Sequence, residues 1–131
     1  NLVAHSSAED TDWFVVFMDE APDGSAKVLT KGWLRASHRE LNPERSKSWQ
    51  PWHSHSQEIP LNPNQSEEFA IEIIPTCNVF QPGHRIRLEL SSCDSVADNF
   101  FWYHAAKALK AKNTVHEGKD GSRLMLPVIP R

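Results

Sequence analysis

Residues 85–90, RIRLEL, constrain the fold of this chain more than any other stretch, because their side chains alternate without a break. Ile86, Leu88 and Leu90 fall on one side of an extended backbone, and the charged side chains between them fall on the other. A period of two residues is typical of a β-strand with one face on an apolar core and one face in water. The sequence therefore predicts a β domain built around this strand.

A second strand is expected over residues 69–74, where the apolar alternation is less regular. Between the two strands lies a turn at Pro82-Gly83, because proline fixes its own φ and glycine accepts a positive φ. Two arrangements remain open for this region. The two strands form a hairpin, or the turn carries the chain from one sheet to another.

Length and composition place the chain among globular domains and exclude several classes of function. Its 131 residues suffice for one domain, 1–131, with a core of its own. The net charge of -3 supplies no basic field for nucleic acid. No apolar run approaches the roughly 18 residues that a membrane helix needs, and no signal peptide is recognisable. These features predict neither a nucleic-acid partner nor a membrane partner, and they favour a cytoplasmic location.

The two cysteines, Cys77 and Cys93, are expected to be free thiols. In a simple hairpin their sulfurs would lie roughly 16 Å apart at about 3.3 Å per residue, which is too far for a disulfide. That estimate does not hold if the turn connects two sheets. Free thiols are consistent with a reducing compartment.

Further elements follow from local patterns along the chain. Residues 13–18, WFVVFM, are apolar on both faces, as expected of a central strand, and a turn follows at 20–25. Strands are expected at 27–30 and 33–37, with Gly32 as a bulge or kink between them.

The second half of the chain is less regular. Residues 40–66 contain four prolines and no periodicity, which predicts a long surface connection that Trp49 and Trp52 pin down. A short helix is expected near 100–111, where alanine, leucine and lysine are frequent. A closing strand is expected at 123–128.

Four segments resemble motifs of a known family. The motif from Pro75 to Ser92, P-T-x-x-x-F-x-x-G-H-R-I-R-L-x-L-S-S, resembles the C-terminal β-sandwich domain of the X-Pro dipeptidyl-peptidase and cocaine esterase family of serine hydrolases. The other three segments, in family order, are Asp10-Thr11-Asp12-Trp13, residues 32–39 (GWLRASHR) and residues 122–129 (SRLMLPVI).

The resemblance implies an all-β, jelly-roll-like sandwich similar to galactose-binding domains. It also implies that strands preceding residue 1 in the family are missing here, so that the sandwich is partial at its N-terminus. The chain departs from the family after Ser92, where the usual F-P-x-x-D-R-N is replaced by residues 93–99, CDSVADN. The resemblance therefore assigns no role to residues 93–99.

The chemistry of the family belongs to a separate catalytic domain with a G-x-S-x-G elbow. Glycine occurs here only at positions 24, 32, 83, 118 and 121, and no two of these are four residues apart. We therefore expect no catalytic residues, no cofactor and no enzymatic activity, because a fold does not by itself imply a function.

Six polar residues within or next to the family motifs are candidates for a structural polar network: Asp10, Asp12, Arg35, Arg39, His84 and Arg85. Carboxylate–guanidinium pairs can tie strand ends together, since the geometry of arginine suits bidentate pairing. The alternative is a polar binding pocket. The sequence does not indicate which aspartate pairs with which arginine.

Two further groups of side chains suggest binding. His53 and His55, with Glu58 nearby, could begin a zinc or copper site, but two histidines without a third ligand at fixed spacing favour a solvated loop, and no metal site is predicted. The candidate binding residues are the aromatic side chains Trp49, Trp52, Trp102 and Tyr103, on which a sugar could stack.

The function that these observations favour is a non-catalytic structural or interaction module. A sandwich without its first strands leaves strand edges and an apolar face open. We therefore expect a homodimer, or a partner chain that covers the open edges. The alternative function is a carbohydrate-binding or small-ligand-binding module that uses the loop tryptophans.

Overall fold

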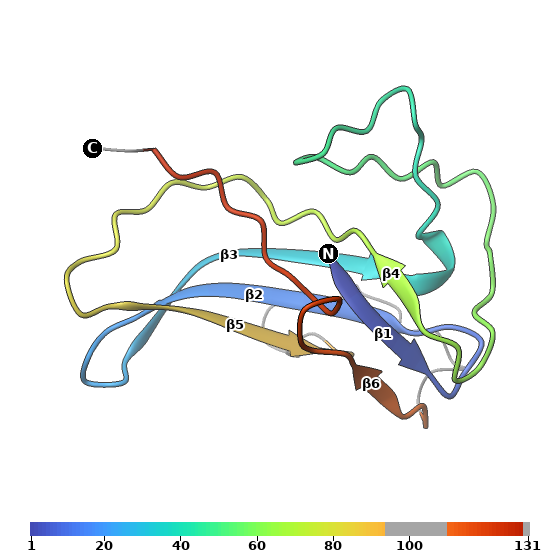
Figure 1. Ribbon diagram of the computed structural model, residues 1–131, viewed down its shortest axis with the longest axis horizontal. Coiled ribbons are helices and arrows are strands. Elements are labelled where there is room, and N and C mark those ends of the chain that lie inside the picture. Colours follow the sequence, from blue (N-terminus) through green and yellow to red (C-terminus); the bar gives the residue numbers. More distant parts are fainter. Residues whose placement is uncertain (94–109, 130–131) are drawn as a thin grey trace.

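The computed structural model describes residues 1–93 and 110–129, which form two antiparallel three-stranded sheets (Figure 1). The smaller sheet has the order β4-β1-β6, and the larger sheet has the order β3-β2-β5. The strands are β1 (Leu2–Ser6), β2 (Asp12–Glu20), β3 (Ala26–Arg35), β4 (Glu67–Phe69), β5 (Arg85–Ser91) and β6 (Asn113–Val115). A single 3-10 turn, η1 (Ala36–His38), is the only helical element among the described residues. The predicted all-β sandwich is confirmed, whereas the helix expected near 100–111 lies almost entirely outside the described residues.

The hairpin of β2 and β3 is the longest ladder of the domain, and β2 is the central strand that its apolar sequence predicts. The chain reverses at 21–25, where Gly24 has a φ of 85° and its amide donates to the carbonyl of Ala21 at 2.9 Å. The register shifts opposite Phe17 and Met18, which pair with Thr30 and Val28, so the bulge in β3 lies at Leu29.

The prediction of a bulge or kink at Gly32 was wrong, because β3 runs unbroken through this residue. Gly32 instead permits a close approach of a neighbouring segment, with which it forms an isolated bridge at Ile73. A Cβ atom at position 32 would lie 2.3 Å from the backbone oxygen of Glu72. Glycine is therefore required here by contact between two backbones and not by a positive φ.

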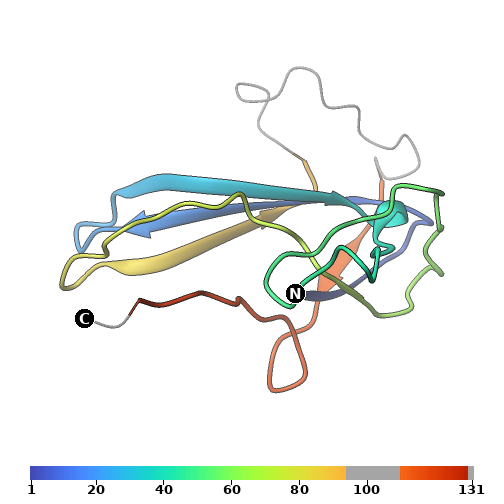
Figure 2. The ribbon, with the colours of Figure 1, turned by 90° about the horizontal axis from the view of Figure 1, so that it is seen from above.

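The strand predicted at 85–90 is confirmed as β5, but it does not pair with the segment before it. β5 pairs with β2, whereas β4 pairs with β1 in the other sheet. Of the two arrangements that the sequence left open, the structure shows the crossing between sheets. Residues 70–84 form this crossing and run along the larger sheet before the Pro82-Gly83 turn (Figure 2). Gly83 has a φ of 84°, and the amide of His84 donates to the carbonyl of Gln81 at 3.0 Å.

The core lies where the small sheet covers one end of the large sheet. Trp13 and Phe69 are almost completely buried, and their ring centroids are 5.5 Å apart. The other buried members of this cluster are Leu2, Ala4, Leu34, Ala36 and Leu61, and Ile71 packs against them. The core thus joins both sheets to η1 and to the end of the long connection 40–66.

Three further predictions fail. The strand expected over 69–74 does not form, because β4 ends at Phe69 and the residues after it make only an isolated bridge at Ile73. Residues 123–128 form no strand; beyond one reciprocal pair of backbone hydrogen bonds between Asn1 and Arg123, this segment runs along the molecule without a ladder. Residues 40–66 are the expected connection, but Trp49 and Trp52 do not pin it down, because 67% and 41% of their surfaces are exposed. The expectation for the cysteines is confirmed, since Cys77 and Cys93 are both free and exposed.

Candidate interaction surface

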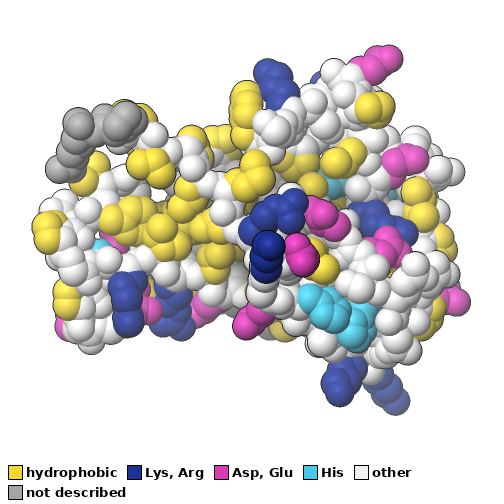
Figure 3. All heavy atoms as spheres, viewed as in Figure 1, with side chains coloured by type: hydrophobic (Ala, Val, Ile, Leu, Met, Phe, Trp, Pro, Cys, Tyr) yellow, Lys and Arg dark blue, Asp and Glu magenta, His cyan; other side chains and the backbone are white. Residues whose placement is uncertain are grey.

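The apolar side of β5 is open to solvent, although its alternation predicts a strand with one face on the core. Ile86, Leu88 and Leu90 are 46%, 43% and 38% exposed. Leu88 lies opposite Phe17 of β2, which is buried and packs edge-to-face against Phe80 at 6.1 Å. Hydrophobic side chains gather over the half of the large sheet that lies farther from the N-terminus (Figure 3). We call Ile86, Leu88 and Leu90 the β5 stripe.

The other side of β5 carries charges that pair among themselves. Arg85 and Arg87 both form ion pairs with Glu20 of β2, and Arg87 also pairs with Glu89. Exposed ion pairs of this kind contribute about 0–1 kcal/mol each to stability. The two sides of β5 therefore differ sharply, with hydrophilic pairs on one side and the uncovered β5 stripe on the other. Among the described residues, the second edge of β5 has no strand partner.

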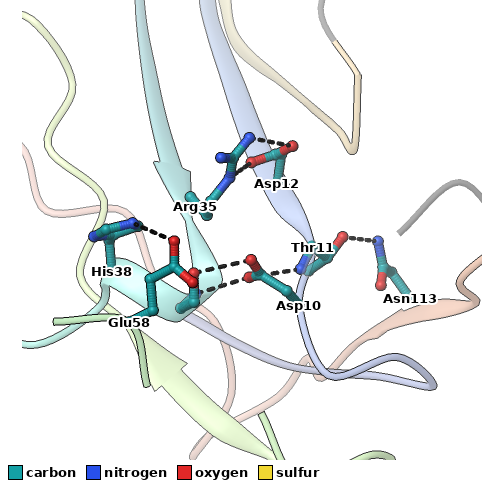
Figure 4. Close-up of polar contacts among 8 residues, drawn as sticks. Asp10, Thr11, Asp12, Arg35, His38, Glu58 and Asn113 are labelled. Atoms are coloured by element: carbon teal, nitrogen blue, oxygen red, sulfur yellow. Dashed lines mark hydrogen bonds and ion pairs between the residues drawn. The ribbon is translucent and has the colours of Figure 1, made fainter. Parts of the chain in front are cut away.

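A polar cluster fastens the start of β2 to the end of β3 (Figure 4). Asp12 lies directly opposite Arg35, and its Oδ1 accepts a hydrogen bond from Arg35 Nε at 2.9 Å. This ion pair raises the pKa of Arg35, chiefly through the hydrogen bond. Asp10 accepts from the backbone amide and the hydroxyl of Ser37 at 2.8 and 2.9 Å. The structure thus supplies the pairing that the sequence left open.

Thr11 and Asn113 extend this cluster to the small sheet, which the sequence did not indicate. The side-chain amide of Asn113 on β6 donates to the hydroxyl of Thr11 at 2.9 Å. Both residues are ordinary polar side chains about a hundred positions apart in the sequence, and no local pattern joins them. Only the pairing of β6 with β1 brings them together.

The remaining polar candidates lie apart from this cluster. Arg39 forms an ion pair with Glu67 and donates to the backbone oxygen of Ala36 at 3.2 Å. At the opposite end of the large sheet, His84 Nδ1 lies 2.8 Å from Asp19 Oδ1. A hydrogen bond from Asn78 and another from His84 lower the pKa of Asp19. Arg85, as described above, pairs with Glu20. The six residues therefore do not converge on one pocket.

The aromatic candidates do not form a common platform among the described residues. The guanidinium of Arg45 lies 3.6 Å from the ring centroid of Trp52, and the ammonium of Lys47 lies 4.9 Å from that of Trp49. One face of each ring is thus in contact with a cation. Trp102 and Tyr103 lie outside the described residues. Sugar binding by these side chains stays a prediction.

A hollow of about 600 Å³ lies beside the end of β3, and neither Trp49 nor Trp52 lines it. Its wall includes Trp33, Arg35, Glu72 and the three histidines His38, His53 and His55. Burial lowers the pKa of His53, and the imidazoles of His55 and His38 lower it further, against a hydrogen bond to the backbone of Ala70 that raises it. His38 was not expected in this group.

Comparison with known proteins identifies the kind of domain that this fold represents. The family described as the X-Pro dipeptidyl-peptidase C-terminal non-catalytic domain matches residues 1–124. Cocaine esterase from a Rhodococcus species is 32% identical over 146 aligned positions, which cover 99% of this chain and 22% of that protein.

Solved structures agree with this assignment. A CocE/NonD family hydrolase from Staphylococcus aureus superimposes with a TM-score of 0.68 at 28% identity, over 75% of this chain and 20% of that one. A second structure of the same hydrolase gives a TM-score of 0.65 at 23% identity and covers 87% of this chain.

The chain belongs to the family of X-Pro dipeptidyl-peptidase C-terminal non-catalytic domains. It spans only 16% to 22% of the length of the curated relatives that it matches. The predicted resemblance and the non-catalytic assignment are therefore confirmed. In the described part of the chain, no helix combines the length and the apolar character needed to cross a membrane.

Proposed function

We propose that this domain acts as an interaction module that has no hydrolytic activity of its own, and that the β5 stripe is its docking surface. The observation that carries the proposal is the exposure of Ile86, Leu88 and Leu90 on one side of a well-formed strand. Burial of apolar surface contributes about 25 cal/mol per Å². A complex in which another protein surface covers the stripe is therefore stabilised by that burial. The edge of β5 that has no strand partner among the described residues adds backbone hydrogen-bonding groups to the same site.

The relatives suggest what covers this surface. The matched region makes up 20% to 23% of the Staphylococcus aureus hydrolase chains, so most of each of those chains is available to pack against it. In our proposal the stripe contacts a hydrolase domain where one is present. When residues 1–131 are alone, the same stripe contacts a second copy, and the chain forms a homodimer.

Light scattering on a sizing column tests this proposal with the chain at tens of micromolar. We expect the mass of a dimer for the wild-type chain and the mass of a monomer for Leu88→Lys, since a charge in the stripe opposes its burial. Val28→Lys is the matched control, because Val28 is similarly exposed but pairs with Met18 and so lies on the opposite side of the sheet. A wild-type monomer, or a dimer that Leu88→Lys leaves intact, would contradict the proposal.

The absence of activity is tested separately with ester and X-Pro amide substrates. We expect no turnover above that of the buffer, because the sequence contains no G-x-S-x-G elbow. Turnover that co-elutes with the chain and persists through repeated purification would show that the domain is an enzyme after all.

A further inference from the structure

We propose that His38, His53 and His55 form a binding site for a late first-row divalent metal ion such as Zn²⁺ or Cu²⁺, in the hollow beside the end of β3. The three side chains come from two separate segments. His38 ends η1, whereas His53 and His55 belong to the long connection 40–66. A bridge between Leu41 and His53 holds these two segments together.

The first observation behind this site is that two imidazole nitrogens on its wall are buried without a hydrogen-bond partner. They are His38 Nδ1 and His53 Nε2. A buried nitrogen without a partner is costly, and each such atom needs a physical explanation. A metal ion is one ligand that satisfies nitrogen lone pairs of this kind, because neutral imidazole is a preferred ligand of zinc and copper.

The second observation is that an oxygen-bearing neighbour lies beside each of these two rings. His53 hydrogen-bonds to the backbone of Ala70. His38 Nε2 lies 3.8 Å from Glu58 Oε1. Metal-binding histidines commonly donate their second ring N–H to a carbonyl or a carboxylate, which fixes the tautomer and leaves the other nitrogen free for the metal.

The third observation concerns the spacing of the rings. The centroid of His55 lies 5.5 Å from that of His38 and 6.0 Å from that of His53. Imidazoles bound to one ion at a Zn–N distance of about 2.0–2.1 Å have centroids roughly 5–6 Å apart. Glu72 lines the same hollow and adds negative charge, and the positive charge of Arg35 is paired with Asp12.

The site requires a side-chain rotation before it can hold an ion. As the structure stands, no three His, Cys, Asp or Glu side chains among the described residues are arranged to hold a metal. His55 is the residue placed to supply the movement, because it is exposed and lies in an irregular connection. Its φ of 49° is uncommon for a residue other than glycine, and such conformations concentrate at functional sites.

Titration of the tag-free chain with Zn²⁺ in a calorimeter, and with Cu²⁺ under electron paramagnetic resonance, tests the proposal. Cys77 and Cys93 are exposed thiols and would compete for both ions, so both are first replaced by serine. We expect one ion per chain and hyperfine coupling from more than one imidazole nitrogen. His38→Gln and His53→Gln should each weaken binding by at least about tenfold.

A second histidine pair in the small sheet provides the matched control. His5 Nδ1 and His116 Nε2 lie 3.0 Å apart, so these two nitrogens already satisfy each other. His116→Gln should therefore leave the affinity unchanged. The proposal is overturned if no stoichiometric binding occurs at 100-micromolar-range concentrations of either ion, or if His116→Gln removes binding while His38→Gln and His53→Gln keep it. The spectrum of the Cu²⁺-loaded chain decides the question even if one variant does not fold.

Discussion

Replacing Arg35 by methionine tests whether the ion pair at the start of β2 stabilises the large sheet. Asp12 is 1% exposed and Arg35 is 28% exposed, so the substitution leaves a carboxylate inside the protein without its cationic neighbour. Breaking a fully buried pair costs about 3–5 kcal/mol. Because solvent reaches Arg35 and screens its charge, we expect a smaller loss, about 2–3 kcal/mol in the free energy of unfolding.

Urea unfolding followed by tryptophan fluorescence measures this loss, because Trp13 lies in the core and reports its exposure. In thermal unfolding, the same loss corresponds to a fall in Tm of about 8–12 °C for a domain of this size. Arg87→Met is the control on the same sheet. Arg87 is 43% exposed, and Glu20 keeps its ion pair with Arg85, so we expect the effect to stay below about 0.5 kcal/mol.

The double variant Asp12→Leu/Arg35→Met separates the ion pair from the packing of the two side chains. Removing both charges leaves no buried carboxylate, so the double variant should be more stable than Arg35→Met by about 1 kcal/mol or more. If Arg35→Met unfolds within about 0.5 kcal/mol of the wild type, Asp12 does not depend on this partner and the reasoning is refuted.

Two further predictions concern the crossing segment 70–84. Gly32→Ala should lower stability by about 1–3 kcal/mol in the same urea assay, because its Cβ would force the backbone of Glu72 away from β3; an unchanged midpoint would show that the two backbones are not in contact. Asn78→Ala should destabilise the domain at neutral pH, because the hydrogen bond from Asn78 stabilises the ionised carboxylate of Asp19 and lowers its pKa. This stabilisation is complete above the pKa of Asp19 in the unfolded chain, about 4, and it is lost as the carboxylate takes up a proton at lower pH. The effect of the substitution should therefore shrink as the pH falls below about 4. Urea midpoints from acidic to neutral pH measure this difference, and a difference that stays constant with pH would contradict it.

Much of the fold follows from the sequence because it depends on local physics. Alternation of side chains sets the face of a strand, and the restricted φ of proline and the free φ of glycine set the turns at 21–25 and 81–84. The apolar sequence of β2 likewise predicts a strand with neighbours on both sides. Each of these features rests on residues within about ten positions of one another.

The predictions that were wrong concern contacts between residues far apart in the sequence. Residues 123–128 have the composition of a strand, but a strand also needs an edge to pair with, and only Arg123 reaches Asn1. Gly32 is required by a backbone forty positions away, which no pattern around it reveals. The two-residue alternation of side chains correctly locates the apolar side of β5, but the sequence of a single strand does not show what covers that side.

The candidate sites show the same difference between local patterns, which the sequence reveals, and contacts between distant residues, which it does not. The sequence finds the acidic and basic residues near β2 and β3, and only the register opposes Asp12 to Arg35. It also finds His53 and His55 as a pair. It misses His38, because the turn of η1 and the bridge at Leu41 place this side chain beside a loop that begins after it.

The position of β1 in the small sheet has a consequence for the time course of folding. β1 is the central strand of its sheet, yet its two partners are β4 and β6, and His5 contacts His116, which is 111 residues later. At about 5–20 residues per second on the ribosome, β1 is made roughly 5–20 s before β6 exists. During that time β1 can pair with β4 but not with β6. Such non-local pairing slows folding, and a chaperone that shields β1 would help this domain more than one that acts on β6.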